Sequence, residues 1–268
     1  MRRQKIKAIV LAAGKGKRLK MLTQKIPKPM LRVSGEIILE HNLKWLKHNG
    51  ITDIFINLHH LPQVIKNYFL DGRAWGLNIK YSFEKKLLGT AGAVRKILSE
   101  YPDEFKSGNF FVVYGDNFYP MSYNLKDVII AHQKNKRYLS IGLYPNIDKA
   151  NTKHCGVVLL GKHNLIKAFI EKPRLDDEEP RQDAITKEIL KQGYLNAAVY
   201  LLNQKIMEFI PEGFSDFGRE IFSTLIKNKV ACNGYVFAQS LIAVDTFDLY
   251  KKANKMSRFH KVPALSML

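Results

Sequence analysis

The sequence predicts an α/β protein with a mostly parallel mixed sheet and a small antiparallel insertion. Between residues 6 and 145, short apolar runs alternate with amphipathic stretches, which is the pattern of consecutive βαβ units. After residue 150 this rhythm changes to two apolar runs joined by a short polar turn, as in a hairpin. The 268 residues, 46% of them hydrophobic, are enough to bury one large core, so we expect one compact domain.

The first half of the chain carries the alternating elements. Apolar runs bounded by turn residues predict strands over 6–14, 51–58, 77–83, 109–116 and 138–145. Amphipathic stretches predict helices over 36–50, 61–72, 90–101 and 124–135. In the first helix Leu39, Leu43 and Leu46 recur at helical spacing. Gly50 then stops that helix, and Pro62 suits the first turn of the next.

The second half begins with the expected hairpin within 154–173, where Gly161 and Asn164 lie in the polar turn. The stretch 174–183 is the most polar of the chain and contains a proline, so we expect a mobile loop near the site that the preceding strand supports. The remaining runs predict a strand over 194–202, a helix over 214–228, a strand over 231–239 and a helix over 247–259.

Composition restricts the class of protein. No apolar run approaches the roughly 18 residues needed to span a bilayer, and the short apolar stretch near the N-terminus is better explained as a buried strand than as a signal peptide. Cys155 and Cys232 have neither disulfide nor zinc spacing, so we expect a cytoplasmic protein. The net charge of +19 attracts anionic partners, but the basic residues are spread along the chain, which disfavours a nucleic-acid module.

A glycine turn follows the first predicted strand. Gly14 and Gly16 would let backbone N–H groups approach a phosphate, while Lys15 and Arg18 add positive charge. Leu19 stands where the dinucleotide fingerprint needs its third glycine, and the GxxxxGK[ST] phosphate loop is absent. The turn alone therefore fits phosphate binding and an ordinary tight turn equally well.

Lys28 lies between Pro27 and Pro29, about a dozen residues after the glycine turn. The two prolines restrict the backbone around it, so the ammonium could be presented to phosphate oxygens in a fixed place. A solvent-facing lysine in a proline-rich loop is the alternative.

Two aspartates follow apolar strands. Gly115 and Asp116 end the strand over 109–116, and ligands of open α/β sheets gather at such carboxyl ends. Magnesium needs oxygen ligands and usually takes one or two carboxylates, so Asp245 at a second strand end is the expected partner. Asp245 could instead cap the last helix. Glu171 and Lys172 end a further strand, where they could bind sugar hydroxyls and a sugar phosphate or form a surface pair.

Six motifs occur in one order between about residues 6 and 255: LAAGKGKRL, IPKPML, LLGTAGAV, YGDN, FIEKP and LNAAVYLL. With this set the chain resembles the nucleotidyltransferase family of NDP-sugar pyrophosphorylases, especially mannose- and manno-heptose-1-phosphate guanylyltransferases. The resemblance implies a single-domain Rossmann-like (GT-A-like) three-layer sandwich. It also implies a nucleotide-binding half over about 1–120 and a sugar-binding half over about 121–255.

The resemblance implies a role for each motif residue. The expected catalytic residues are Arg18, Lys28, Asp116 and Lys172. The expected nucleotide-binding residues are Leu11, Ala12, Ala13, Gly14, Lys15, Gly16, Gly89 and Thr90. The expected substrate-binding residues are Glu84, Gly115, Glu171 and Asn196. Asp116 and Asp245 would hold Mg²⁺, although many members read DxGT where this chain has Asp245 two positions later. Asp248 is the fallback ligand.

The implied reaction is in-line attack of a sugar 1-phosphate on the α-phosphorus of a nucleoside triphosphate, with pyrophosphate leaving. The segment EKKLLGTAGAV is similar to that of guanylyltransferases and favours GTP. The Asp-Thr pair and YGD are similar to cytidylyltransferases for glucose 1-phosphate or phosphocholine, and the chain length also suits an N-acetylmuramate-1-phosphate uridylyltransferase. No hexapeptide repeat follows residue 260, so we expect no β-helix domain. A non-catalytic sugar-nucleotide sensor and a nucleic-acid binder are the competing classes, and homo-oligomer formation stays open.

Overall fold

A computed structural model describes residues 5–106, 108–135, 138–147, 152, 154–173 and 184–255. The polar stretch expected to form a loop, 174–183, lies outside the described residues, as does the end of the last predicted helix. Within the described part of the chain, no helix combines the length and apolar character needed to cross a bilayer.

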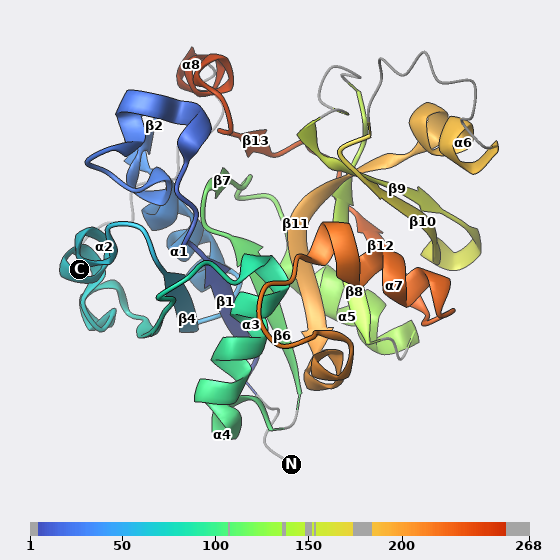
Figure 1. The fold of residues 1–268 in the computed structure, drawn as a ribbon, viewed down its shortest axis with the longest axis horizontal. Helices are drawn as coiled ribbons and strands as arrows, with labels where there is room; N and C mark the ends of the chain where they lie inside the picture. Colours follow the sequence, from blue (N-terminus) through green and yellow to red (C-terminus); the bar gives the residue numbers. More distant parts are fainter. Residues whose placement is uncertain are drawn as a thin grey trace.

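The centre of the molecule is a nine-stranded mixed sheet (Figure 1). Its strands are β1 (Lys7–Leu11), β4 (Asp53–Leu58), β5 (Asn78–Phe83), β6 (Asn109–Tyr114), β8 (Leu139–Tyr144), β9 (Gly156–Leu160), β10 (Ile166–Glu171), β11 (Tyr194–Asn203) and β12 (Cys232–Val236). The order is β10-β9-β11-β6-β1-β4-β5, with β8 joining β11 to β12. All strands run the same way except β10 and β11, which confirms the mostly parallel arrangement. The expected hairpin β9–β10 extends this sheet.

Helices cover both faces of the sheet and make three layers. One core packs α1 (Ile38–His48), α2 (Pro62–Phe69), α5 (Leu125–Asn135) and α6 (Ala184–Gln192) against the sheet. The other packs α3 (Gly89–Glu100), α4 (Pro102–Phe105) and α7 (Phe222–Lys227) against the opposite face. Along β1, Ala8 and Val10 belong to the first core, whereas Ile9 and Leu11 belong to the second. Burial on both faces explains the continuous apolar run at this strand.

Several local elements differ from the sequence prediction. Residues Glu36–Ile37 form β3 with β2 (Arg32–Val33), so the first helix begins two residues later than expected. The helix expected over 214–228 is divided into a π-helical turn, Phe217–Ile221, and α7. The short helices α4 and α6 were not predicted.

A two-stranded ladder brings the segment after β12 to the exit of β6. In this ladder β7 (Asn117–Phe118) pairs antiparallel with β13 (Ile242–Ala243), and α8 (Phe247–Lys255) follows β13. Phe118, Val244 and Ala253 share a small core with Leu31 and Ile38, which anchors this last segment. The ladder therefore joins residues more than one hundred positions apart in the sequence.

Candidate active site

The glycine loop, residues 12–17, follows β1. Gly16 has a φ of +59°, and a Cβ there would lie 2.8 Å from Thr23 Cγ2 and 3.2 Å from Lys28 Cβ. Both the backbone conformation and the space therefore require glycine. The Thr23 hydroxyl donates to the Gly16 carbonyl at 3.0 Å and closes the loop. A Cβ on Gly14 would meet no atom within 4 Å, so this part of the loop borders open space.

Asn57, near the end of β4, connects the glycine loop to the segment after β5. Its Oδ1 accepts a hydrogen bond from Ala12 N at 2.6 Å, and its Nδ2 donates to Glu84 Oε1 at 2.6 Å. The second oxygen of Glu84 accepts from Leu88 N at 2.9 Å. Asn57 is 3% exposed and Glu84 1%. Sequence reasoning missed Asn57, whose signal is a polar residue inside the apolar run of this strand.

The motif at the start of α3 packs against residues 213–217. A Cβ on Gly89 would lie 2.3 Å from the Ser215 carbonyl oxygen, and Gly89 has a φ of +73°. Thr90 Oγ1 donates to Asp216 Oδ2 at 3.1 Å and accepts from Phe217 N at 2.9 Å. These two expected nucleotide-binding residues thus join the two halves of the chain. The side chains of Leu11, Ala12 and Ala13 are buried, and the backbone of Leu11 and Ala12 is already hydrogen-bonded, to Gly115 N and to Asn57 Oδ1.

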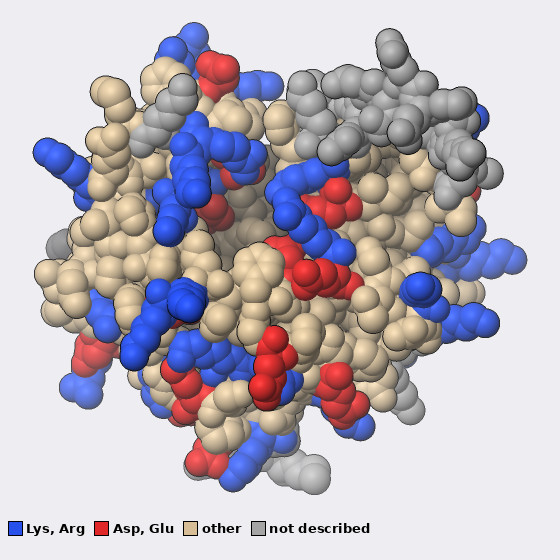
Figure 2. All heavy atoms as spheres, in the orientation of Figure 1, with Lys and Arg blue, Asp and Glu red and all other residues tan. Residues whose placement is uncertain are grey.

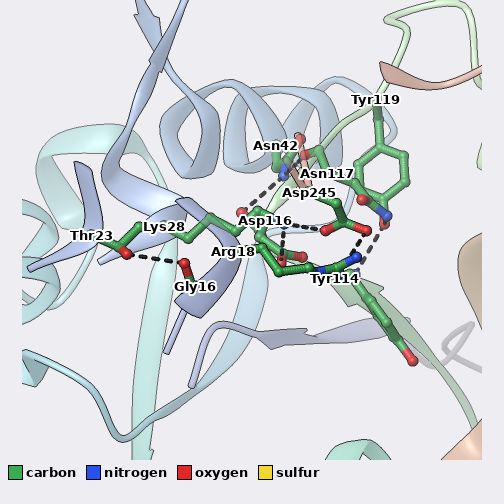
Figure 3. Close-up of polar contacts among 11 residues, drawn as sticks. Gly16, Arg18, Thr23, Lys28, Asn42, Tyr114, Asp116, Asn117, Tyr119 and Asp245 are labelled. Carbon is green, nitrogen blue, oxygen red and sulfur yellow. Dashed lines mark hydrogen bonds and ion pairs between the residues drawn. The ribbon is translucent and has the colours of Figure 1, made fainter. Parts of the chain in front are cut away.

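The structure brings four of the expected residues into one charged cluster (Figure 3). Lys28 Nζ lies 2.7 Å from Asp116 Oδ2 and 2.6 Å from Asp245 Oδ1. Arg18 Nη2 lies 3.2 Å from the other oxygen of Asp245. The Lys28 side chain is 6% exposed, so the solvent-facing alternative does not apply.

The β7–β13 ladder explains why the two aspartates meet. Asn117 pairs with Ala243, and the two strands are antiparallel. Asp116, just before β7, and Asp245, just after β13, therefore lie at the same end of the ladder. Asn42, on α1, donates through Nδ2 to the Asn117 carbonyl at 2.7 Å and supports this turn. The first turn of α8 is capped by the Thr246 hydroxyl, which accepts from Leu249 N at 3.3 Å. The carboxylate of Asp245 is thereby free to contact Lys28.

Mutual attraction favours the charged forms of Lys28 and Asp245. Burial lowers the pKa of Lys28, but the charges and hydrogen bonds of Asp116 and Asp245 raise it more, so the pKa lies above its ordinary value. Burial raises the pKa of Asp245, but Lys28 and Arg18 lower it below its ordinary value. Lys172 also lowers the Asp245 pKa, which places its charge on the same side of the site.

Glu171 and Lys172 lie at the end of β10. Lys172 Nζ is 3.4 Å from Glu171 Oε1, and the Lys172 backbone has a φ of +50°. The Glu171 carboxylate lies over two glycines, because a Cβ on Gly218 would be 2.4 Å and one on Gly156 2.8 Å from its Oε2. Burial raises the pKa of Glu171, and Lys172 partly offsets the shift. The site holds this carboxylate in a confined place.

Asn196 shapes a bulge in β11. Its Oδ1 accepts from Ala198 N at 2.9 Å, and its Nδ2 donates to Tyr200 Oη at 2.9 Å. The register of β11 against β8 shifts between Asn196 and Tyr200, and Ala198 has a φ of +54°. Tyr119, the residue after β7, donates through Oη to the Ala198 carbonyl at 2.9 Å and supports the bulge.

Figure 2 shows a hollow flanked on both sides by basic side chains, with acidic side chains at its rim. Among the described residues no three His, Cys, Asp or Glu side chains form a metal-binding group. Asp116 and Asp245 nevertheless fit magnesium, since both already bind one cation, the Lys28 ammonium. Magnesium usually takes one or two carboxylates and completes its coordination with water and substrate phosphates.

The chain is similar to known nucleotidyl transferases. A family model with that description matches residues 7–240. The chain is 30% identical to D-glycero-α-D-manno-heptose 1-phosphate guanylyltransferase of Campylobacter jejuni over 219 residues, which cover 81% of this chain and 82% of the relative. It is also 30% identical to UTP–glucose-1-phosphate uridylyltransferase of Synechocystis over 231 residues, 82% of this chain but 55% of that relative. The solved structure of HddC from Yersinia pseudotuberculosis matches with a TM-score of 0.72 at 22% identity, covering 94% of this chain and 99% of HddC, and at this identity supports the fold alone.

Proposed function

Because the chain belongs to the nucleotidyl transferase family, we propose that it joins a sugar 1-phosphate to a nucleoside triphosphate and releases pyrophosphate. The observation that carries this proposal is the cluster of Lys28, Asp116 and Asp245 beside the glycine loop. Two anionic reactants must meet here, so the site needs cations and fixed N–H donors more than a nucleophilic side chain.

Each part of the site then has a task. The backbone of the glycine loop would bind the triphosphate, and Arg18 and Lys28 would neutralise the phosphates on the leaving side. Asp116 and Asp245 would hold Mg²⁺, whose charge assists both substrates' phosphates. Lys172 would bind the sugar phosphate, while Glu171 would accept hydrogen bonds from sugar hydroxyls.

We propose GTP as the nucleotide and mannose or manno-heptose 1-phosphate as the acceptor. Two observations support this choice. The relative from Campylobacter jejuni is a guanylyltransferase for a manno-heptose 1-phosphate, and HddC has been solved with GMP-PN. UTP with glucose 1-phosphate is the second candidate, since the Synechocystis relative uses that pair.

The decisive experiment measures pyrophosphate release from each of GTP, CTP, UTP, ATP and dTTP with a panel of sugar 1-phosphates and phosphocholine. We expect release with GTP and a manno-configured sugar 1-phosphate. Release with UTP and glucose 1-phosphate alone would assign the second candidate. Nucleotide binding without any release across the panel would contradict catalysis with these substrates and favour a sensor or a sugar outside the panel.

A further inference from the structure

The charged cluster is balanced without any metal ion. Lys28 and Arg18 contribute two positive charges, and Asp116 and Asp245 contribute two negative ones. The Lys28 ammonium lies between the two carboxylates, at hydrogen-bond distance from both. A divalent ion bound by both carboxylates would occupy that same place.

The ammonium and a divalent ion exclude each other. Mg²⁺ holds carboxylate oxygens at about 2.0–2.1 Å, so each carboxylate would close by about 0.6 Å around the ion. An ammonium left in the same pocket would then stand at contact distance from a doubly charged cation, in a place that is nearly inaccessible to solvent. Lys28 must leave before or while the metal enters.

The Lys28 side chain can move toward the glycine loop while its backbone stays fixed. The backbone at Lys28 is fixed by Pro27, Pro29 and the 3₁₀ turn Lys28–Met30, whereas its side chain has four rotatable bonds. The Lys28 Cβ lies close to Gly16, since a Cβ added to that glycine would be only 3.2 Å away from it. A triphosphate bound to the glycine loop would therefore lie within reach of the released ammonium.

We propose that the Lys28 ammonium is an internal counter-ion that closes the Asp116–Asp245 metal position until a triphosphate draws it away. This inference rests on the proposed function, because the triphosphate is its trigger. The divalent ion then enters together with the nucleotide, and the two carboxylates never face each other without a cation between them. The nucleotide-free protein consequently binds divalent ions weakly.

The test measures Mn²⁺ binding in the absence of nucleotide, with free Mn²⁺ followed by electron paramagnetic resonance. The proteins are the wild type, Lys28→Met, Lys28→Gln and the control Lys25→Met, which removes an equal charge from an exposed residue nearby. We expect both Lys28 variants to bind Mn²⁺ about tenfold more tightly or better, since one buried positive charge is gone. Lys25→Met should match the wild type, and the double variant Lys28→Met/Asp116→Asn should lose the gain.

Thermal unfolding supplies a second readout, which includes a measurement on the wild type alone. Mn²⁺ alone should raise the unfolding midpoint of Lys28→Met by about 3 °C or more and leave the wild type unchanged. Equal Mn²⁺ affinity of the wild type and a folded Lys28 variant would overturn the proposal. So would a rise in the wild-type midpoint with Mn²⁺ alone. Because no nucleotide or sugar is added, these outcomes are separate from failure of the pyrophosphate assay.

Discussion

Asn57 Nδ2 donates to Glu84 Oε1 at 2.6 Å while the other end of the same amide accepts from the backbone of the glycine loop. One buried side chain thus sets the distance between two segments that would surround the nucleotide. Neither segment can move independently without leaving a buried polar group unpaired, which costs about 1–3 kcal/mol.

Replacing Asn57 by Asp keeps the acceptor for Ala12 and places a carboxylate against the carboxylate of Glu84. We expect the free energy of unfolding at pH 7 to fall by about 3 kcal/mol, since the new charge is buried beside a like charge. Urea unfolding measures this. Asn78→Asp is the matched control, because Asn78 also donates to a carboxylate, Asp53, but at an exposed position. Equal losses in both variants would contradict the structural role of the Asn57 amide.

Gly16→Ala tests the closure of the glycine loop. The added Cβ would meet Thr23 Cγ2, and the alanine would have to keep a positive φ. We therefore expect a loss of about 1–2 kcal/mol in the free energy of unfolding. Gly14→Ala should change stability by less than about 0.5 kcal/mol, because no atom lies near its Cβ. Adding Thr23→Ser to Gly16→Ala removes the clashing methyl group and should recover part of the loss. No recovery would mean that the backbone conformation alone causes the effect.

Gly218→Ala is expected to change the KM for one substrate and not for the other. Its Cβ would lie 2.4 Å from Glu171 Oε2, so the flexible carboxylate must shift while the fold persists. We expect the KM for the sugar 1-phosphate to rise by about tenfold, equivalent to one lost hydrogen bond, and the KM for the nucleotide to stay within about twofold. Gly161→Ala displaces the Lys167 side chain in the same way, far along the hairpin, and serves as the control. A rise in the KM for the nucleotide instead would contradict the assignment of Glu171 to sugar binding.

The charged cluster itself predicts a loss of rate. Asp116→Ala and Lys28→Ala should each lower the rate of pyrophosphate release by about 10²-fold or more, as expected when one preorganised electrostatic group is removed. Asp103→Ala, at an exposed aspartate paired with Lys106, should keep the wild-type rate. Near-normal turnover in either folded cluster variant would refute the role assigned to that residue.

The alternation of apolar and amphipathic runs is sufficient to predict the layers and most strands, because strands buried on both faces leave continuous apolar runs and the helices between them have an amphipathic period. The meeting of Lys28, Asp116 and Asp245 depends on a ladder of two residues per strand, which is too short for any periodicity. Gly89 packs against Ser215, a contact between distant segments that no local pattern encodes. Helix α6 is not predicted because it directly follows the most polar stretch of the chain, whose proline and charged residues indicate a loop.

His132 predicts how stability depends on pH. It is buried on α5, where its Nδ1 lies 2.9 Å from Ser140 Oγ, and burial lowers its pKa to about 4. The unfolded chain, with a histidine pKa near 6.5, binds more protons than the folded one between these values, so stability falls as pH falls from about 6.5 to 4. Between pH 7 and pH 5, protonation of this histidine in the unfolded chain should lower the free energy of unfolding by about 2 kcal/mol. His132→Asn should reduce the pH-dependent loss by that amount in urea unfolding at the two pH values, and an unchanged loss would assign it to other groups.

Because the β7–β13 ladder brings Asp245 into the cluster, the site is completed only late in synthesis. The glycine loop and Lys28 leave the ribosome early, Asp116 follows, and Asp245 comes more than one hundred residues later. An unfinished chain can therefore fold around its first strands while it still lacks the second carboxylate of the cluster. Cleavage between β12 and β13, followed by loss of the C-terminal segment, would have the same result and leave Lys28 in contact with Asp116 alone.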